Sequence, residues 1–329
     1  KAAAQIEGSK DFAKQLMERH DIPTAKYQTF DDLERSTAYV RKHGAPIVIK
    51  ADGLAAGKGV TVAMDEETAI AALDDIFIDH RFGNAGAKVV IEDFLEGQEF
   101  SLMSFVNGTE FWPMPISQDH KRAYDGDKGP NTGGMGAYSP VPQIGQDVID
   151  TAIETIVKPT VQAMADEGTP FTGILYAGLI ATADGPKVIE FNARFGDPET
   201  EVVLPKLTSD LGAGINAILN NETPEFTWDE HNATLGVVLA SDGYPTNVIK
   251  GAAIPEIPVD EDSHVFYAGV TRDEHGLIAN SGRVLFVETS APDIKAAQDK
   301  VYAIIDKLDT KGMFYRHDIG AKALQALNA

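Results

Sequence analysis

The sequence has 329 residues, a net charge of −22 and the 43% hydrophobic content of an ordinary globular protein. This length suits about two or three domains, and the negative charge disfavours nucleic-acid partners, which require basic surfaces. The absence of cysteine excludes disulfides and thiolate metal sites, and no apolar run is long enough to cross a membrane. This composition fits a cytoplasmic protein. We also expect a monomer that binds small molecules rather than nucleic acid or a membrane.

The first third of the chain predicts an alternation of helices and strands. Ser9 is expected to cap a helix that ends near His20, and a second helix over 31–43 is expected to end at Gly44. The next expected elements, in chain order, are a strand over 46–50, a strand over 60–63, a helix over 65–79 and a strand over 89–91.

Residues 118–140 interrupt this rhythm with turn-forming and charged residues. A segment this long between elements is functional or disordered, and Tyr124, Met135 and Tyr138 favour an ordered loop. After residue 234, strands with glycine and proline turns predominate. The other expected elements are antiparallel strands over 100–106 and 110–117 that turn at Asn107 and Gly108, helices over 146–167, 204–219 and 292–308, and strands over 173–181 and 187–195.

The strand expected over 187–195 carries the first candidate site. Glu190, Asn192 and Arg194 alternate with apolar residues, so they are expected to share one face. Carboxylate and amide oxygens suit Mg²⁺, and the arginine fork suits phosphate or carboxylate. An ordinary half-buried strand would show the same alternation, so this strand alone leaves both interpretations open.

A glycine-rich segment, 52–59, follows the strand that ends in Lys50. Its small residues leave backbone N–H groups free to approach phosphate, and Lys58 adds positive charge. It is not a Walker A loop, because three residues rather than four separate Gly53 from Gly57, and Gly59 follows the lysine. A flexible hairpin turn beside a solvated lysine is the alternative interpretation.

The crossing at 91–99 joins two expected strands. Such a crossing offers backbone groups to adenine, with Phe94 and Leu95 as apolar walls. Glu99 is either an acceptor for ribose hydroxyl groups or a solvated acid, and the crossing alone does not decide between them.

Several segments, in order along the whole chain, resemble the phosphoribosylamine–glycine ligase family of the ATP-grasp superfamily. The resembling segments are residues 7–10, 49–60, 117–122, 129–140, 188–200 and 316–320. The resemblance implies an α/β (α+β) ATP-grasp fold of two α+β subdomains that clasp ATP, plus a small, mostly β C-terminal domain. The implied boundaries are an ATP-grasp domain over 1–232, with 25–98 as the ATP lid and 99–232 with 1–24 as the central part, and a C-terminal domain over 233–329. Family members begin with a further substrate domain, which this sequence does not contain.

The resemblance also implies a reaction. ATP phosphorylates glycine, the amine of 5-phosphoribosylamine attacks the glycyl phosphate, and glycinamide ribonucleotide, ADP and phosphate form in de novo purine biosynthesis. Another ATP-grasp carboxylate–amine ligase and a non-catalytic ATP-binding fragment are the alternatives.

The resemblance assigns roles to residues of this sequence. The implied metal ligands for Mg²⁺ or Mn²⁺ are Glu190 and Asn192, and the implied catalytic residues are Lys50, Asp119 and Arg194. The implied ATP-binding residues are Lys10, Lys50, Gly53, Gly57, Lys58, Gly59, Glu92, Phe94, Leu95 and Glu99. The implied substrate-binding residues are Asp119, for the glycine amine, and Lys121, Asn131, Gly133, Gly134, Met135, Gly136 and Asp197.

Overall fold

The computed structural model describes residues 1–54, 59–81 and 83–328, and its contacts divide the chain into two units. Each unit is assembled from separate parts of the sequence. Unit 1 contains Lys1–Glu99, Met103–Pro113 and Ile144–Arg194, and unit 2 contains Phe100–Leu102, Met114–Gln143 and Phe195–Ala329. The boundaries expected for the ATP-grasp and C-terminal domains stay a prediction.

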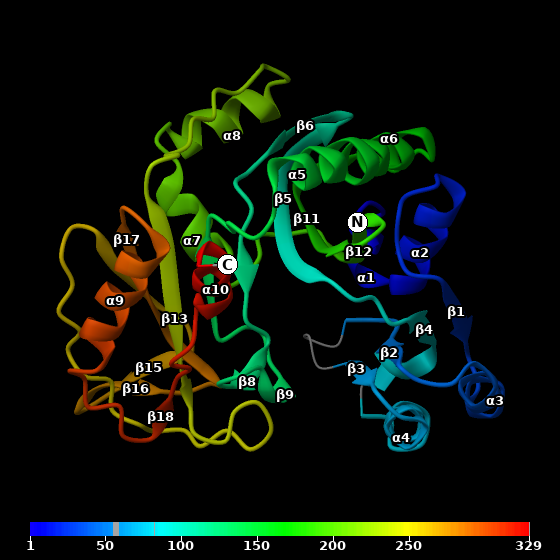
Figure 1. Ribbon diagram of the computed structural model, residues 1–329, viewed down its shortest axis with the longest axis horizontal. Coiled ribbons are helices and arrows are strands. Elements are labelled where there is room, and N and C mark those ends of the chain that lie inside the picture. The colour runs from blue at the N-terminus through cyan, green and yellow to red at the C-terminus, as the bar shows by residue number, and fades with distance from the viewer. Residues whose placement is uncertain (55–58, 82, 329) are drawn as a thin grey trace. The chain divides into compact units, whose positions relative to one another are not determined.

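A four-stranded antiparallel sheet in unit 1 packs against two helices, as Figure 1 shows. Its strands, in spatial order, are β1 (Tyr27–Phe30), β4 (Val89–Asp93), β2 (Ile47–Ala51) and β3 (Val60–Ala63). The helices are α3 (Leu33–His43) and α4 (Glu66–Phe77). Asp32 and Asp65 begin them by accepting hydrogen bonds from backbone amides in the first turn, and Gly44, at φ 84°, ends α3. These elements confirm the sequence expectation for this region.

The second sheet of unit 1 supports the expected site strand. Its spatial order is β12 (Gly185–Asn192), β11 (Phe171–Thr182), β5 (Gln98–Gly108) and β6 (Glu110–Pro113), of which residues 100–102 count toward unit 2. The helices of this part are α1 (Gln5–Gly8), α2 (Lys10–Arg19), α5 (Gln146–Ala152) and α6 (Lys158–Asp166). The expected helix over 146–167 is thus present, with a π-helical turn at Ile153–Val157 between α5 and α6. α6 packs on β11 and β6 (Figure 1).

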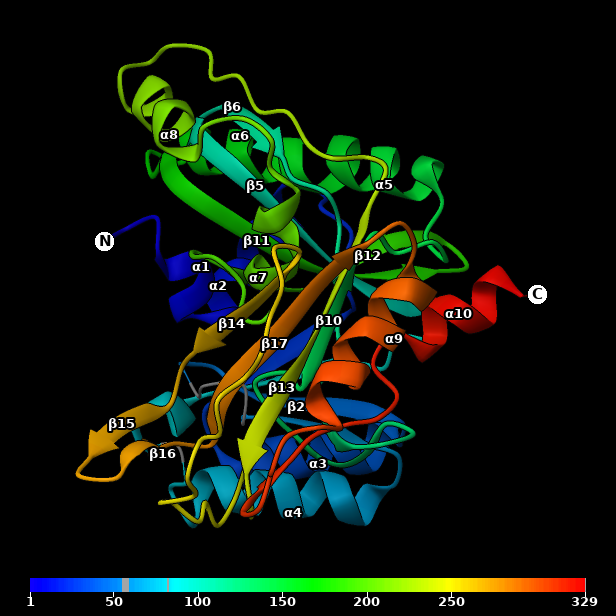
Figure 2. The same cartoon turned by 90° about the vertical axis from the view of Figure 1, so that its left-hand side faces the viewer.

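Unit 2 is built on a mixed-length antiparallel sheet in the order β14, β17, β13, β10, β7, with β18 also paired to β13. Helix α9 (Ile294–Ile305) packs on the two longest strands, β13 and β17 (Figure 2). The strands are β7 (Gln118–Asp119), β10 (Gly136–Ser139), β13 (Ala233–Ser241), β14 (Ser263–Tyr267), β17 (Arg283–Ala291) and β18 (Met313–Phe314). Two separate hairpins are formed by β8 (Arg122–Tyr124) with β9 (Lys128–Asn131) and by β15 (Val270–Asp273) with β16 (Gly276–Ala279).

The expectation of one long loop over 118–140 is wrong. The segment forms β7, β8, β9 and β10, of two to four residues each. Such short strands show no alternation that a sequence pattern would reveal, and β10 pairs with β13, about a hundred residues later. The expectation that the segment is ordered fits its burial, because Met135 and Tyr138 are fully buried.

The expected helix over 204–219 is interrupted. Its parts are α7 (Thr200–Val203), a 3₁₀ turn (Leu204–Lys206) and α8 (Leu211–Leu219). Leu207 is extended, and the Asp210 side chain begins α8 by accepting from the amide of Ala213. β6 also ends earlier than expected, and the C-terminal α10 (Ala321–Leu327) was not expected. No helix in the described ranges is long and apolar enough to span a membrane.

Candidate active site

The strand β12 differs from its sequence expectation in register and length. Ile189 is an extra residue, because β11 pairs Gly178 with Glu190 but Leu179 with Val188. A bulge of this kind shifts the alternation of the side chains around it. Val188 and Phe191 are buried, and the strand ends at Asn192, so the regular alternation expected over 187–195 is wrong. Glu190 and Asn192 both follow the bulge and therefore still share a face.

Arg194 lies in the bend after β12 rather than in the strand. Its Nε is 3.1 Å from Oε1 of Glu7, and its Nη2 donates to Oδ1 of Asn192 at 3.3 Å. The other carboxylate oxygen of Glu7 accepts from the amide of Ala193 at 2.9 Å. Glu7, on α1, therefore fixes the arginine beside Asn192. The sequence reasoning missed this role, although Glu7 begins one of the resembling segments.

A buried cluster of two lysines and one glutamate lies behind the site strand. Nζ of Lys50 is 2.8 Å from Oε1 of Glu92 and donates to the carbonyl oxygen of Ile189 at 2.9 Å. Nζ of Lys14 is 3.0 Å from the other oxygen of Glu92. All three side chains are at most 5% exposed. Lys50 thus joins the first sheet of unit 1 to the strand that carries Glu190.

Electrostatics in this cluster follow from burial and pairing. Burial lowers the pKa of Lys14 to about 8, against the opposing effect of Glu92. Burial opposes ionisation of Glu92, but the charges of Lys50 and Lys14 outweigh it and lower its pKa. Two lysines enclose the Glu92 side chain, and its backbone pairs with Tyr27 and Val48 inside the sheet. Binding of ATP by Glu92 stays a prediction.

Lys14 was not singled out from the sequence. It lies one helical turn after Lys10 on α2, on the face that also buries Ala13 and Met17. A lysine at an apolar position of an amphipathic helix was the available signal. Helical spacing alone, however, does not identify Glu92 as its partner.

Lys10 lies where α2 meets the glycine-rich segment. Its Nζ donates to the carbonyl oxygens of Ala51 and Gly53, at 2.9 and 3.2 Å. The carboxylate of Asp52 accepts from the Ser9 hydroxyl at 3.1 Å and from a backbone amide of the first turn of α2 at 2.7 Å. Burial lowers the pKa of Lys10, and the charge of Glu190 is the main opposing effect. The carboxylate of Glu190 therefore favours the charged form of Lys10.

The rest of the expected ATP-binding set is only partly described. Gly59 accepts a hydrogen bond from the amide of Ala51 at 2.8 Å, whereas Gly57 and Lys58 lie outside the described residues. Phe94 and Leu95 are half-buried in the crossing from β4 to β5, and Glu99 is exposed near the start of β5. Their contacts with adenine and ribose stay a prediction.

The metal ligands expected on β12 form a partial set. Among the described residues, no three His, Cys, Asp or Glu side chains are grouped so that they could hold a metal ion. Glu190 and Asn192 supply one carboxylate and one amide oxygen from the same strand face. This donor set fits Mg²⁺ or Mn²⁺, because such ions take one or two protein ligands and complete their shell with phosphate and water oxygens.

The substrate residues expected at 119–136 lie in unit 2. Nζ of Lys121 is 2.8 Å from Oδ2 of Asp119, whose side chain is almost completely buried. Arg283 then joins two expected segments, because its Nη1 donates to the carbonyl oxygen of Gly133 at 3.0 Å and lies 2.9 Å from Oδ1 of Asp197. The Tyr244 hydroxyl accepts from the amide of Gly133 at 2.9 Å. The sequence did not single out Arg283 or Tyr244, because both are remote from the motif.

Packing explains two of the glycines in this segment. A Cβ at Gly134, whose φ is 120°, would lie 2.5 Å from Cδ of Pro198, and a Cβ at Gly136 would lie 2.7 Å from Ile319. Met135 is fully buried, and its amide and carbonyl are bonded to His120 and Val238. Asn131 ends β9 and is half-buried. Binding of a substrate by these residues stays a prediction.

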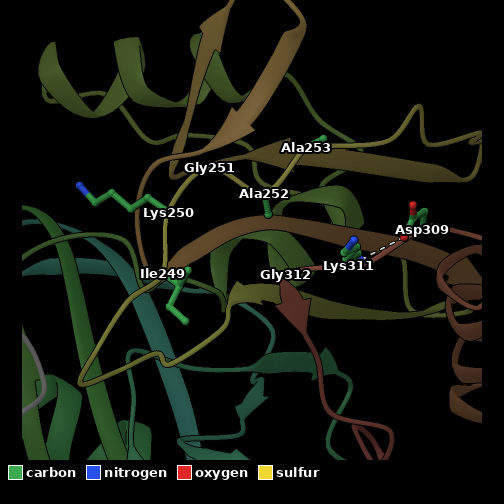
Figure 3. Close-up of a pocket in the computed structure, with 8 residues that line it drawn as sticks. All are labelled: Ile249, Lys250, Gly251, Ala252, Ala253, Asp309, Lys311 and Gly312. Atoms are coloured by element: carbon green, nitrogen blue, oxygen red, sulfur yellow. Dashed lines mark hydrogen bonds between the residues drawn. The ribbon is translucent and has the colours of Figure 1, made fainter.

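A shallow hollow of about 400 Å³ elsewhere in unit 2 contains none of the expected site residues (Figure 3). Its lining residues are Ile249, Lys250, Gly251, Ala252, Ala253, Asp309, Lys311 and Gly312.

Comparison with known proteins gives the same family across both halves of the sequence. Residues 8–200 match the phosphoribosylglycinamide synthetase ATP-grasp (A) domain, and residues 234–322 match the C domain of the same synthetase. The chain is 55% identical to the phosphoribosylamine–glycine ligase of Streptococcus pyogenes serotype M18, covering 99% of this chain and 77% of the relative. It is 58% identical to that of Lactococcus lactis subsp. lactis, covering 98% and 77%.

A crystal structure of phosphoribosylamine–glycine ligase from Thermotoga maritima is similar in fold as well as sequence. It superposes with a TM-score of 0.88 at 36% identity, covering 97% of this chain and 80% of that chain. The expected ATP-grasp fold of mixed α and β structure is thereby confirmed.

Proposed function

The chain belongs to the phosphoribosylamine–glycine ligase family, and we propose from this premise how its residues perform the ATP-dependent ligation of glycine to 5-phosphoribosylamine. The enzyme is an ATP-dependent carbon–nitrogen ligase of purine biosynthesis. One observation in unit 1 carries the assignment of roles. Lys50 on β2 donates to the carbonyl oxygen of Ile189, next to Glu190, and the charge of Glu190 opposes the burial that lowers the pKa of Lys10 on α2.

The two lysines bind the phosphates of ATP. Phosphoryl transfer depends on positively charged groups that are held in place around the phosphates. The chain has a net charge of −22, so individual lysines must supply this positive charge locally. Hydrogen bonds to the carbonyls of Ala51, Gly53 and Ile189 fix both ammonium groups. The side chains are therefore oriented before the nucleotide binds, which reduces the entropy lost on binding.

Glu190 and Asn192 hold a divalent metal ion, for which we propose Mg²⁺. When bound, the ion neutralises charge on the β- and γ-phosphates. Asn192 keeps its oxygen oriented through the hydrogen bond from Arg194. The guanidinium of Arg194, held by Glu7, is half-exposed and therefore remains accessible to a phosphate or carboxylate oxygen.

The chemistry proceeds in two displacements. A carboxylate oxygen of glycine attacks the γ-phosphorus of ATP, ADP leaves, and glycyl phosphate forms. The amine nitrogen of 5-phosphoribosylamine then attacks the glycyl carbonyl carbon and loses a proton, and phosphate leaves with the former carboxylate oxygen. Positive charge near the transferred group stabilises the first displacement, and the lysines and Arg194 supply it.

We assign the amine of glycine to Asp119 and phosphoribosylamine to the segment around Gly133. The Asp119 carboxylate already binds one ammonium group, that of Lys121, at 2.8 Å. A glycine ammonium would replace a group of the same charge and hydrogen-bonding type. Arg283 and Tyr244 hold the Gly133 segment in its place, so they act on the substrate through the backbone.

ADP release measured with each substrate omitted in turn tests the proposal. We expect ADP release to require both glycine and 5-phosphoribosylamine. Lys50→Met is expected to abolish ADP release while the sheet that contains β2 stays folded. Release that proceeds at the same rate without glycine would exclude the ligase assignment.

A further inference from the structure

Lys14 is a buried cation that the reaction described above does not use. It exposes 2% of its surface and lies on α2 behind the site. Its Nζ is 3.0 Å from Oε2 of Glu92 and donates to the hydroxyl of Thr24 at 2.7 Å. Both partners belong to unit 1, and the two displacements described above use neither of them directly.

Burying a charged lysine costs desolvation free energy, which a neutral side chain would avoid. Burying an ion pair often stabilises a fold no better than packed apolar residues would, so stability alone is weak grounds for Lys14. Glu92 carries one negative charge and faces two ammonium groups. With both lysines charged, the Lys14–Glu92–Lys50 cluster has a net charge of +1.

Lys14 affects how much positive charge Lys50 presents to a phosphate. Among the described residues, two acceptors engage the Lys50 ammonium, the Glu92 carboxylate and the Ile189 carbonyl, whereas an ammonium has three donors. If Glu92 faced Lys50 alone, its charge would cancel that of Lys50 at a distance of 2.8 Å. Lys14 occupies the opposite oxygen of Glu92 and so prevents this cancellation.

We propose that Lys14 is a positioning residue for ATP, which binds Glu92 from behind and thereby leaves Lys50 oriented and positively charged toward the phosphates. This inference rests on the proposed function, because it assigns Lys50 to ATP. Lys14 itself touches no phosphate and acts only through Glu92.

The surroundings of Lys14 make the role measurable through pH. The charged and titratable groups that face it are Glu92 and Asp93 on β4, Lys50 on β2 and the ring of Tyr27 on β1, 5.7 Å from Nζ. Burial brings the pKa of Lys14 down to about 8, so its charge is present at pH 7 and largely lost at pH 9. An arginine in its place would stay charged across this range.

Calorimetric titration of the 329-residue chain with MgATP at pH 7 and pH 9 tests the proposal. At pH 7 we expect Lys14→Met to weaken binding about tenfold, the effect of one removed charge at close range in a partly screened site. Lys14→Arg should bind MgATP like the wild type at pH 7. At pH 9 the wild type should approach Lys14→Met, whereas Lys14→Arg should bind more tightly than either.

The control variant is Lys42→Met, which removes the same charge from an exposed position of α3 in the same unit. It should bind MgATP like the wild type at both pH values. If Lys14→Met does not fold, the comparison of Lys14→Arg with the wild type at pH 9 still decides the question.

Two outcomes would overturn the inference, and both differ from a failure of the proposed function. Wild-type affinity in Lys14→Met at pH 7, or equal affinity of Lys14→Arg and the wild type at pH 9, would show that Lys14 is only structural. A wild-type chain that does not bind MgATP at all would instead contradict the ATP assignment itself.

Discussion

Replacing Arg316 by methionine is expected to destabilise the segment that carries the substrate residues. The Arg316 side chain is 1% exposed, although it is one of the longest in the protein. Its Nε and Nη2 donate to the two oxygens of Asp318 at 2.7 and 2.8 Å. Its Nη1 donates to Oδ1 of Asp127 at 2.9 Å and to the carbonyl oxygen of Arg122 at 3.0 Å. One side chain therefore ties the C-terminal segment to the β8–β9 hairpin.

The magnitude follows from the carboxylate of Asp318. Burial opposes its ionisation, but hydrogen bonds from Arg316 and from the amide of Gly126 outweigh this and lower its pKa from 3.8 to about 2. At about 1.4 kcal/mol per pH unit, this corresponds to at most about 2.5 kcal/mol. Because the Asp318 side chain is 26% exposed, solvent screening reduces the expected loss for Arg316→Met to about 1–2 kcal/mol at pH 7.

Urea unfolding at several pH values measures this loss. A carboxyl group whose pKa is lowered in the folded state stabilises the fold above pH 3.8, and the contribution disappears as the pH falls through about 2. The difference between wild type and Arg316→Met should therefore be constant from pH 7 to about 5 and shrink below pH 4. A difference that is absent at pH 7, or that does not change with pH, would refute the reasoning.

Three further changes have directions fixed by the structure. Glu190→Gln should raise the Mg²⁺ concentration needed for half-maximal ADP release by about tenfold, because it removes a charged oxygen ligand. The melting temperature should stay within about 2 °C, because no core contact is lost. An unchanged Mg²⁺ dependence with a lower melting temperature would show that Glu190 is structural. Gly136→Ala should cost about 1–3 kcal/mol in urea unfolding, because the new Cβ would lie 2.7 Å from its neighbour, whereas Gly8→Ala meets no atom within 4 Å and should not be destabilised. Burial and a nearby aspartate raise the pKa of Glu201 to about 7, so the wild type should lose stability as the pH rises from 4.5 through 7. Glu201→Gln should therefore be more stable than the wild type at pH 8 and equal to it near pH 4, and equal stability at pH 8 would contradict this.

The predictable part of the fold is the part set by local chemistry. Ser9 and Asp65 begin their helices, because their side chains accept hydrogen bonds from backbone amides of the first turn. Gly44 ends α3 at a positive φ angle. The central strands β2 and β4 each begin with three consecutive apolar residues, as expected for strands that are buried on both faces. These signals lie within a few residues of the elements that they define.

The errors arise where a distant partner decides the structure. The bulge at Ile189 depends on how β12 pairs with β11, and no property of residues 187–195 shows it. The short strand β10 exists because β13 supplies its hydrogen bonds, and β7 in turn pairs with β10. A pattern of period two or 3.6 residues has no information on such partners.

The candidate site divides in the same way. Lys10, Lys50, Glu190 and Asn192 were named from the sequence, and all four belong to unit 1. Glu7 contacts Arg194 and Lys14 contacts Glu92 through their side chains, across long stretches of sequence, and both were missed. Arg283 was missed for the same reason, since it contacts Gly133 across 150 residues of sequence.

The most direct measurement of the central claim follows the carboxylate oxygens of glycine. With glycine labelled by ¹⁸O in its carboxylate, the two displacements transfer one labelled oxygen from glycine to each phosphate released. Mass spectrometry of the phosphate after turnover with ATP and 5-phosphoribosylamine should therefore show one ¹⁸O atom per phosphate. Unlabelled phosphate, released together with ADP and glycinamide ribonucleotide, would contradict the glycyl phosphate route proposed for Lys10, Lys50 and Glu190.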